Sequence, residues 1–405
     1  EMQGRLGLGD GTRQPRKAGL QDWLQARELN STQQRLVDER LQEHAGGPCI
    51  GVVVLDLKGD DEGVVRTLES LHPSRNGYAN LYPLLLSVGQ SAKDWQGHRI
   101  SVTSDTWVIT LNQVLQEAEC DWLVLVNPGE TFTVNGLLMA SLELLTAPDC
   151  RAVYCDQVYR QDNAGLGVGF RPAFNLDYLL SFPAGMAHHW LFRRDILLQA
   201  GGFDDTLPGA IELDMILRLI NVGGLAGLGH IAEPLLITDA PVLSDVEDER
   251  LAILRHLQLR GYESPQIDSI QPGQYRIRYE HSRQPLVSVL LLAGSQLSQL
   301  QRCVESLLES TRYPHYELLL IESDPSASEV RDWLTALAGL GEARLRAVWP
   351  DESQLRAASA LNFAAVQAKG DFLLMLSPET AANSCTSRSS TVFSKAACWP
   401  TLRAS

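Results

Sequence analysis

The chain has 405 residues, of which 44% are hydrophobic and 20% charged. This length allows two or three domains of roughly 150 residues each, and the composition is that of a folded globular protein, which excludes a disordered or fibrous chain. The formal net charge is −15, and no block of Lys and Arg occurs. Nothing here would neutralise a phosphate backbone, so the charge argues against nucleic acid and anionic membrane surfaces as partners.

No apolar stretch approaches the ~20 residues that a membrane-spanning helix needs. The longest such stretches are residues 50–55 and 286–293, and the N-terminal sequence EMQGRLGLGDG lacks the apolar segment of a secretory signal. The sequence therefore predicts a cytoplasmic protein without a transmembrane segment, and peripheral membrane association stays open. The seven cysteines form no Cys-x-x-Cys pair, so we expect reduced thiols and neither disulfides nor a zinc site.

The chain begins with a segment of helical pattern. Residues 17–44 place apolar side chains at roughly helical spacing among many charges, and Gly46, Gly47 and Pro48 end the pattern. We expect an N-terminal helical arm over residues 1–47.

The pattern changes at Cys49 to alternating strands and helices. A β-branched run, CIGVVVLDL, is followed by the helical EGVVRTLESL and a second apolar run, LYPLLLSVG. A further helix, TWVITLNQVLQEAE, leads into the apolar strand of DWLVLVNPGE, and RAVYCDQVYR continues the alternation. Strand, helix, strand is the signature of a parallel sheet. The sequence predicts an α/β fold with a doubly wound, mostly parallel sheet, and we assign its domain to residues 48–243.

A repeat connects the two halves of the chain. LNQVLQEAECDWLVLVNPGET returns as LNFAAVQAKGDFLLMLSPET, with Asn112 and Asp121 recurring as Asn362 and Asp371. We therefore expect a helix-strand linker over residues 244–284, followed by a partial second copy of the domain over 285–380 that is cut short. The tail, residues 381–405, has no sustained period, and we interpret it as a frameshift or truncation scar in preference to a functional tail.

Several stretches in order resemble the family 2 glycosyltransferases of the GT-A fold, and more closely the tandem bacterial enzymes, often described as rhamnosyltransferases, that build cell-surface polysaccharides. The matching stretches include DWLVLVNPGETF, AVYCDQVYR, FRRDILLQAGGFDD, IELDMILRL and PLVSVLLLAG. The resemblance implies a nucleotide-diphosphate sugar as donor, a hydroxyl of a glycan or glycoprotein as acceptor, and inversion at the anomeric carbon. It also implies a divalent cation, Mg²⁺ or Mn²⁺, held by carboxylates at the departing diphosphate.

The cation ligands of the family form an Asp-x-Asp motif, from which this chain departs. Asn127, Pro128 and Gly129 occupy the motif, and Glu130 is the nearest acid. By position, Asn127 and Glu130 are candidates for binding the nucleotide sugar, and Glu130 for the metal; the alternative for Glu130 is a solvated turn residue. The departure also favours another class of function, a degenerate glycosyltransferase-like binding or assembly module without turnover.

Two further acids end predicted strands. Asp156 matches the aspartate of the family's Tyr-Ser-Asp-Glu-Asp segment, and we consider it a ligand for metal or for a sugar hydroxyl, or else an acid that caps a turn. Asp56 follows the first strand and could accept a hydrogen bond from the donor's base or ribose, or be an ordinary loop acid. His230 matches a family histidine near the pocket rim, with a structural histidine as the alternative.

The proton acceptor is expected on the helix of IELDMILRL. Glu212 aligns with the family's catalytic base and flanks the apolar stripe of this helix, where it could point into a cleft. Its alternative role is stabilisation of the helix dipole. Asp214 is the second candidate for catalysis, although Arg218 four residues later would pair with it. His188 and His189 are adjacent and would point apart on an extended chain.

Overall fold

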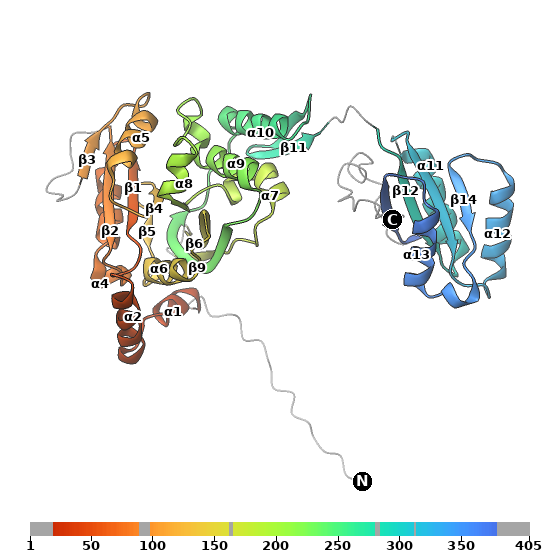
Figure 1. Cartoon of the computed structure of the whole chain (residues 1–405), viewed down its shortest axis with the longest axis horizontal. Coiled ribbons are helices and arrows are strands. Elements are labelled where there is room, and N and C mark those ends of the chain that lie inside the picture. Colours follow the sequence, from red (N-terminus) through yellow and green to blue (C-terminus); the bar gives the residue numbers. More distant parts are fainter. Residues whose placement is uncertain (1–18, 89–97, 162–164, 280–283, 312, 379–405) are drawn as a thin grey trace, which may run out of the picture. The chain divides into compact units, whose positions relative to one another are not determined.

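The computed structural model describes residues 19–88, 98–161, 165–279, 284–311 and 313–378 (Figure 1). The chain divides into two compact units at the junction of Ile277 and Arg278. The tail expected over residues 381–405 lies outside the described residues.

The first unit is built on one large sheet. Its strand order is β3-β2-β1-β4-β8-β6-β9-β5, with β7 paired to β6. Strands β3, β2, β1 and β4 are parallel to one another. The β4–β8, β8–β6, β6–β7 and β9–β5 pairs are antiparallel, and the β6–β9 pair is parallel. The expected α/β fold with a mostly parallel sheet is confirmed. The strands are β1 Ile50–Asp56, β2 Leu81–Ser87, β3 His98–Ser101, β4 Trp122–Val126, β5 Thr131–Phe132, β6 Ala152–Arg160, β7 Leu166–Gly169, β8 Trp190–Arg193 and β9 Leu228–Asp239.

Helices separate these strands in the chain, as βαβ connections require. They are α1 Gly19–Gln25, α2 Ser31–Glu43, α3 Asp61–Ser70, α4 Pro73–Asn76, α5 Trp107–Glu117, α6 Gly136–Thr146, α7 Leu176–Ser181, α8 Arg194–Gln199, α9 Ile211–Gly223 and α10 Glu247–Leu259. The N-terminal arm consists of α1 and α2, and α2 begins with a capping box in which Asn30 accepts from the Gln33 amide.

The core of the first unit lies around β1 and β4. The β-branched run of β1 is buried on both faces, and every residue of β4 is buried. Such continuous burial is why both strands are uninterrupted apolar runs in the sequence. Asp121, just before β4, accepts a hydrogen bond at 2.7 Å from the backbone N–H of Cys49 and so ties the starts of the two strands together.

The segment expected as a linker contains α10 and the hairpin of β10 Gln266–Gln271 and β11 Gln274–Arg278. Helix α10 packs against α9. At the start of α10, Asp248 accepts a hydrogen bond at 2.7 Å from the backbone N–H of Gly209, which precedes α9. As far as Ile277, this segment therefore belongs to the first unit.

The second unit has a four-stranded parallel sheet in the order β14-β13-β12-β15. This order is that of β3-β2-β1-β4, and Val287 pairs with Phe372 as Ile50 pairs with Trp122. The elements are β12 Val287–Ala293, α11 Leu297–Ser310, β13 Tyr316–Glu322, α12 Ser328–Gly339, β14 Leu345–Val348, α13 Ala357–Gln367 and β15 Phe372–Leu376. Among all the residues described above, no helix is both long and apolar enough to cross a bilayer.

Candidate functional site

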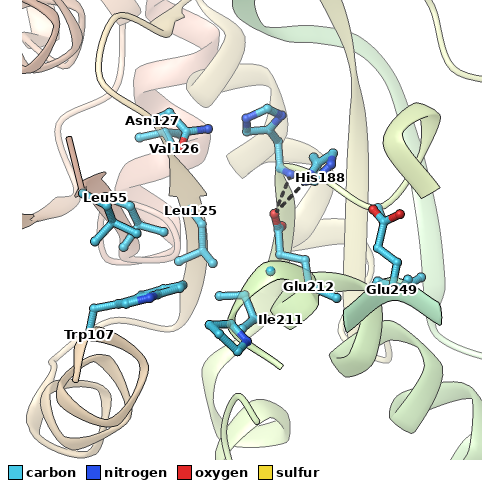
Figure 2. Close-up of a pocket in the computed structure, with 16 residues that line it drawn as sticks. Leu55, Trp107, Leu125, Val126, Asn127, His188, Ile211, Glu212 and Glu249 are labelled. Carbon is cyan, nitrogen blue, oxygen red and sulfur yellow. Dashed lines mark hydrogen bonds and ion pairs between the residues drawn. The ribbon is translucent and has the colours of Figure 1, made fainter. Parts of the chain in front are cut away.

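A cavity of about 220 Å³ lies at the carboxyl ends of β1 and β4 in the first unit (Figure 2). The ends of parallel strands are where open α/β sheets place ligands. The segment before β8, the turn before α9, and helices α9 and α10 complete the wall. The lining residues are Leu55, Leu57, Trp107, Leu125, Val126, Asn127, Ala187, His188, His189, Pro208, Gly209, Ala210, Ile211, Glu212, Leu213 and Glu249.

Glu212 lines this cavity from the first turn of α9, but its carboxylate is already hydrogen-bonded. The backbone N–H of Trp190 donates to Oε1 at 3.0 Å, and that of His189 donates to Oε2 at 3.3 Å. The residue is only 8% exposed. Glu212 therefore anchors the start of β8 as well as facing the cavity.

His188 is the polar side chain next to this carboxylate. Its Nδ1 lies 3.8 Å from Glu212 Oε2, and its side chain is 47% exposed (Figure 2). Desolvation in the cavity opposes a charge on the imidazole, but the contact with Glu212 outweighs it, and the pKa of His188 is raised above its ordinary value. His188 is thus a titratable group held at the wall of the cavity.

His189 connects the cavity to the loop after β4. Its Nε2 lies 2.9 Å from Glu130 Oε2, and its Nδ1 lies 2.5 Å from the side-chain nitrogen of Gln157. Glu130 also accepts from the Asn127 backbone N–H at 2.7 Å. Burial alone would raise the pKa of Glu130, but the His189 imidazole and the two Asn127 donors lower it overall. Glu130 is consequently an ionised, well-bonded residue and not a solvated turn acid.

Asp56, expected at the donor's base or ribose, is 1% exposed at the end of β1. Its Oδ1 accepts from the backbone N–H groups of Gly59 and Asp60 at 2.7 and 2.9 Å, and its Oδ2 from the Ser87 hydroxyl at 2.9 Å. It does not line the cavity. In this structure Asp56 holds the turn that leads into α3.

Asp156 lies within β6, where the pairing with β9 shifts register. Its Oδ1 accepts from the backbone N–H of Arg171 and lies 2.9 Å from His230 Nε2. His230 stacks on Tyr154 with ring centroids 4.6 Å apart. Asp156 does not line the cavity either. The contact of His230 with Asp156 is structural, but Asp156 is itself a candidate site residue, so the contact agrees with both alternatives considered for His230.

Asp214 points to a different partner from Glu212. Its Oδ2 accepts from Arg218 Nε at 2.7 Å, and Arg218 also donates to the carbonyls of Ala200 and Gly202. Burial raises the pKa of Asp214 in spite of the Arg218 charge. The i, i+4 pair expected from the sequence is present, and it ties α9 to the Gly-Gly loop outside the cavity wall.

Glu249 of α10 is a site residue that the sequence patterns do not single out. It is 6% exposed, lines the cavity, and accepts a hydrogen bond from the Tyr275 hydroxyl at 2.8 Å. Burial raises the pKa of Glu249, although the Tyr275 hydroxyl and the charge of His188 act the other way. Only the packing of α10 on α9 brings this acid to the cavity.

The two expected cation ligands are not free in this arrangement. Glu130 is bonded to His189 and Asn127, and Asp156 to His230 and the Arg171 backbone. Across the described ranges, no three His, Cys, Asp or Glu side chains are grouped as metal ligands. A hard divalent cation prefers several free oxygen ligands, so these residues do not fit one as they stand.

No protein-family model matches the chain. It is 29% identical over 268 residues to the O-antigen biosynthesis protein RfbC of Myxococcus xanthus, covering 63% of this chain and 20% of that protein. It is 24% identical over 389 residues to the uncharacterized protein y4gI of Sinorhizobium fredii, covering 90% of this chain and 42% of that protein. The chain thus spans less than half the length of either relative.

Two solved structures with bound nucleotide sugars are similar to the chain at a low level. Residues 1–349 of S. aureus TarS in complex with UDP-GlcNAc match with a TM-score of 0.40 and 11% identity over 51% of this chain and 66% of that one. The mannosyltransferase PcManGT of Pyrobaculum calidifontis, with GDP-Man and Mn²⁺, matches with a TM-score of 0.35 and 15% identity over 56% and 70%. The similarity to an O-antigen biosynthesis protein agrees with the resemblance to enzymes of cell-surface polysaccharide synthesis, whereas the similarity to the two solved structures says nothing about the function or the site residues of this chain.

Proposed function

We propose that the chain is a glycosyltransferase that moves a sugar from a nucleotide-diphosphate sugar to a hydroxyl of a glycan or glycoprotein. The observation that carries the proposal is the cavity at the ends of β1 and β4, with the Glu212 carboxylate and the His188 imidazole in its wall. The similarity to an O-antigen biosynthesis protein supports a role in cell-surface polysaccharide or protein glycosylation. We propose that the reaction takes place in the cytoplasm, with or without peripheral membrane association.

The reaction is a single displacement with inversion. The acceptor oxygen bonds to the anomeric carbon while the bond from that carbon to the diphosphate oxygen breaks, and the electron pair leaves with the diphosphate. The acceptor proton must pass to a base in the site. Glu212 and its contacts are the groups we place at this step, and Asn127 and Glu130, at the end of β4, lie next to the cavity where the diphosphate would bind.

The remaining candidates act at a distance from the cavity wall. Asp56 shapes the turn into α3, and Asp156 with His230 fixes the middle of β6. We propose that both support the donor side of the site through these elements. Asp214 is a weaker candidate for the base than Glu212, because its carboxylate is paired with Arg218.

The second candidate function is a binding or assembly module without turnover. It is favoured by one observation, the loss of the Asp-x-Asp motif at Asn127, Pro128 and Gly129 together with the absence of free carboxylates at Glu130 and Asp156 among the described contacts. Such a module would keep the nucleotide site and lack the chemistry.

Titration calorimetry of the full chain with UDP, dTDP and GDP, with and without Mg²⁺ or Mn²⁺, tests the proposal. We expect at least one nucleotide to bind, and Asp156→Asn to weaken it. The metal arms test the cation expected from the resemblance. If a nucleotide binds but the chain releases no nucleoside diphosphate from the corresponding nucleotide sugar, the result supports the binding module. If no nucleotide binds under any condition, both functions are rejected.

A further inference from the structure

The carboxylate of Glu212 is poorly placed to take a proton itself. Its two oxygens accept the backbone N–H groups of Trp190 and of the preceding His189, at 3.0 and 3.3 Å, and the residue is 8% exposed. Turning toward an acceptor hydroxyl would leave the N–H groups of His189 and Trp190 buried without partners, which proteins avoid.

The imidazole of His188 has the properties that Glu212 lacks. It lines the cavity, its side chain is half-exposed, and Nδ1 is the ring nitrogen beside Glu212. Nε2 is not part of that contact. At 3.8 Å the carboxylate is within ion-pair distance of Nδ1, so its charge favours a proton on the imidazole.

The groups that face His188 come from α9, from α10, from the segment that contains Arg171, and from the neighbouring His189. Glu212 on α9 and Glu249 on α10 favour its protonated form, while desolvation and Arg171, whose guanidinium donates to the His188 carbonyl at 2.8 Å, oppose it. The neighbouring ring of His189 has its centroid 6.2 Å away. Histidine is the side chain whose ordinary pKa lies nearest neutral pH, and this property suits general-base catalysis.

We propose that His188 takes the proton of the acceptor hydroxyl, and that Glu212 is a positioning residue whose charge, beside Nδ1, stabilises the imidazolium that forms. The proton passes to Nε2 as the acceptor oxygen bonds to the anomeric carbon, and the diphosphate leaves with the electron pair of the broken bond. This inference rests on the proposed glycosyl transfer. It changes which side chain accepts the proton and leaves the site where the proposed function puts it.

The test is the pH dependence of sugar transfer by the full chain and its variants. Transfer requires neutral His188, so the rate should rise with pH through a pKa above the ordinary histidine value. His188→Gln should lose ~10² to 10⁴-fold in rate and lose this rise. Added imidazole should restore part of the rate to His188→Ala, which a structural role would not allow.

Glu212→Gln should lose less rate than His188→Gln and move the rise to lower pH, because Glu212 raises the pKa of His188. Glu249→Gln should also move the rise in rate to lower pH. His98→Gln is the control, since His98 is exposed on β3 and outside the cavity wall.

Nucleotide binding measured on each variant shows that it is folded. Full activity in a folded His188→Gln, or a profile that Glu212→Gln leaves in place, would overturn the inference and leave glycosyl transfer intact. If the unaltered chain transfers no sugar and binds no nucleotide, both the inference and the proposed function are wrong.

Discussion

The two units build the same four-stranded sheet and differ in what is attached to it. In the first unit, β4 continues through β8 into the rest of the sheet, and the loops between residues 127 and 249 supply the cavity wall. In the second unit, the described strands are β14, β13, β12 and β15. The strand-helix half therefore packs its own core in either unit, whereas the candidate chemistry depends on the segment that follows β4.

Residues shared by the two copies show which contacts belong to the sheet. Asp121 accepts from the backbone N–H of Cys49, and Asp371 accepts from that of Leu286 at 3.1 Å, each tying the starts of two adjacent strands. Asn112 instead bonds in both directions with the backbone of Phe203, at 2.8 and 2.9 Å, while Asn362 is exposed. The repeated aspartate thus has the same structural role in both units, whereas the repeated asparagine makes its backbone contacts in the first unit.

The two units also differ in which residue is the glycine where β1 approaches β4 and where β12 approaches β15. A side chain at Gly51 in β1 would meet Cys120 Sγ, and one at Gly370 would meet the backbone of Ser288. Gly51 and Ser288 occupy equivalent places in β1 and β12, and Cys120 and Gly370 precede β4 and β15. Each copy therefore keeps one glycine at this contact, on opposite strands.

The largest expected difference between the units is their response to acid. His256 of α10 is 2% exposed, its Nδ1 has no hydrogen-bond partner, and burial lowers its pKa to about 4. The unfolded chain binds this proton more readily, so the first unit should lose stability as the pH falls from about 6.5 to about 4, by roughly 3 kcal/mol. Urea unfolding followed at several pH values measures this, and His256→Leu should remove the dependence. An unchanged dependence in that variant would contradict the assignment.

Gly370→Ala should have the next largest effect, a loss of stability of the second unit. The new Cβ would lie 2.6 Å from the Ser288 backbone nitrogen, and relief requires a backbone shift that costs roughly 2 kcal/mol. Gly339→Ala, at the end of α12 with no atom nearby, is the control and should be neutral or slightly stabilising. Thermal unfolding of the two variants and of the unaltered chain measures the difference. If Gly370→Ala is as stable as Gly339→Ala, the backbone at Ser288 can shift to admit the new Cβ without loss of stability, and the prediction is wrong.

Asn112→Ala should cost about 1 to 3 kcal/mol, because it leaves two backbone groups of the Phe203 loop without partners. Asn362→Ala should change the stability by less than about 0.5 kcal/mol, as expected for an exposed position. Denaturant unfolding of the two variants tests whether the repeated asparagine contributes to stability only in the first unit, where it contacts the loop that contains Phe203. A similar cost at both positions would mean that Asn362 has an equivalent structural role.

Much of the fold could be predicted from the sequence. The uninterrupted β-branched run at residues 50–55 predicts a buried parallel strand, and the repeat predicts a second sheet of like order, because both signals are local. The Asp214–Arg218 pair and the place of Glu212 beside the apolar stripe also follow from helical spacing.

The composition of the cavity wall could not be predicted in the same way. His189 has a left-handed φ of 57°, so the two adjacent histidines line the same cavity instead of pointing apart as an extended chain would place them. Glu249 reaches the cavity only because α10 packs on α9. Both facts depend on tertiary structure, and neither has a local pattern that would reveal it.

The effect of Glu212→Gln and Asp214→Asn on sugar transfer tests the central claim most directly. A panel of nucleotide sugars is screened with the unaltered chain for release of nucleoside diphosphate, and the two variants are then compared with the active donor. We predict that Glu212→Gln loses at least ~10-fold in rate and also some stability, because the Gln side chain has one acceptor oxygen for the two backbone N–H groups that Glu212 accepts. Asp214→Asn should keep most of the rate and lose stability, because Arg218 loses its ionised partner. Full activity in Glu212→Gln together with loss in Asp214→Asn would contradict the account and move the site to the other face of α9.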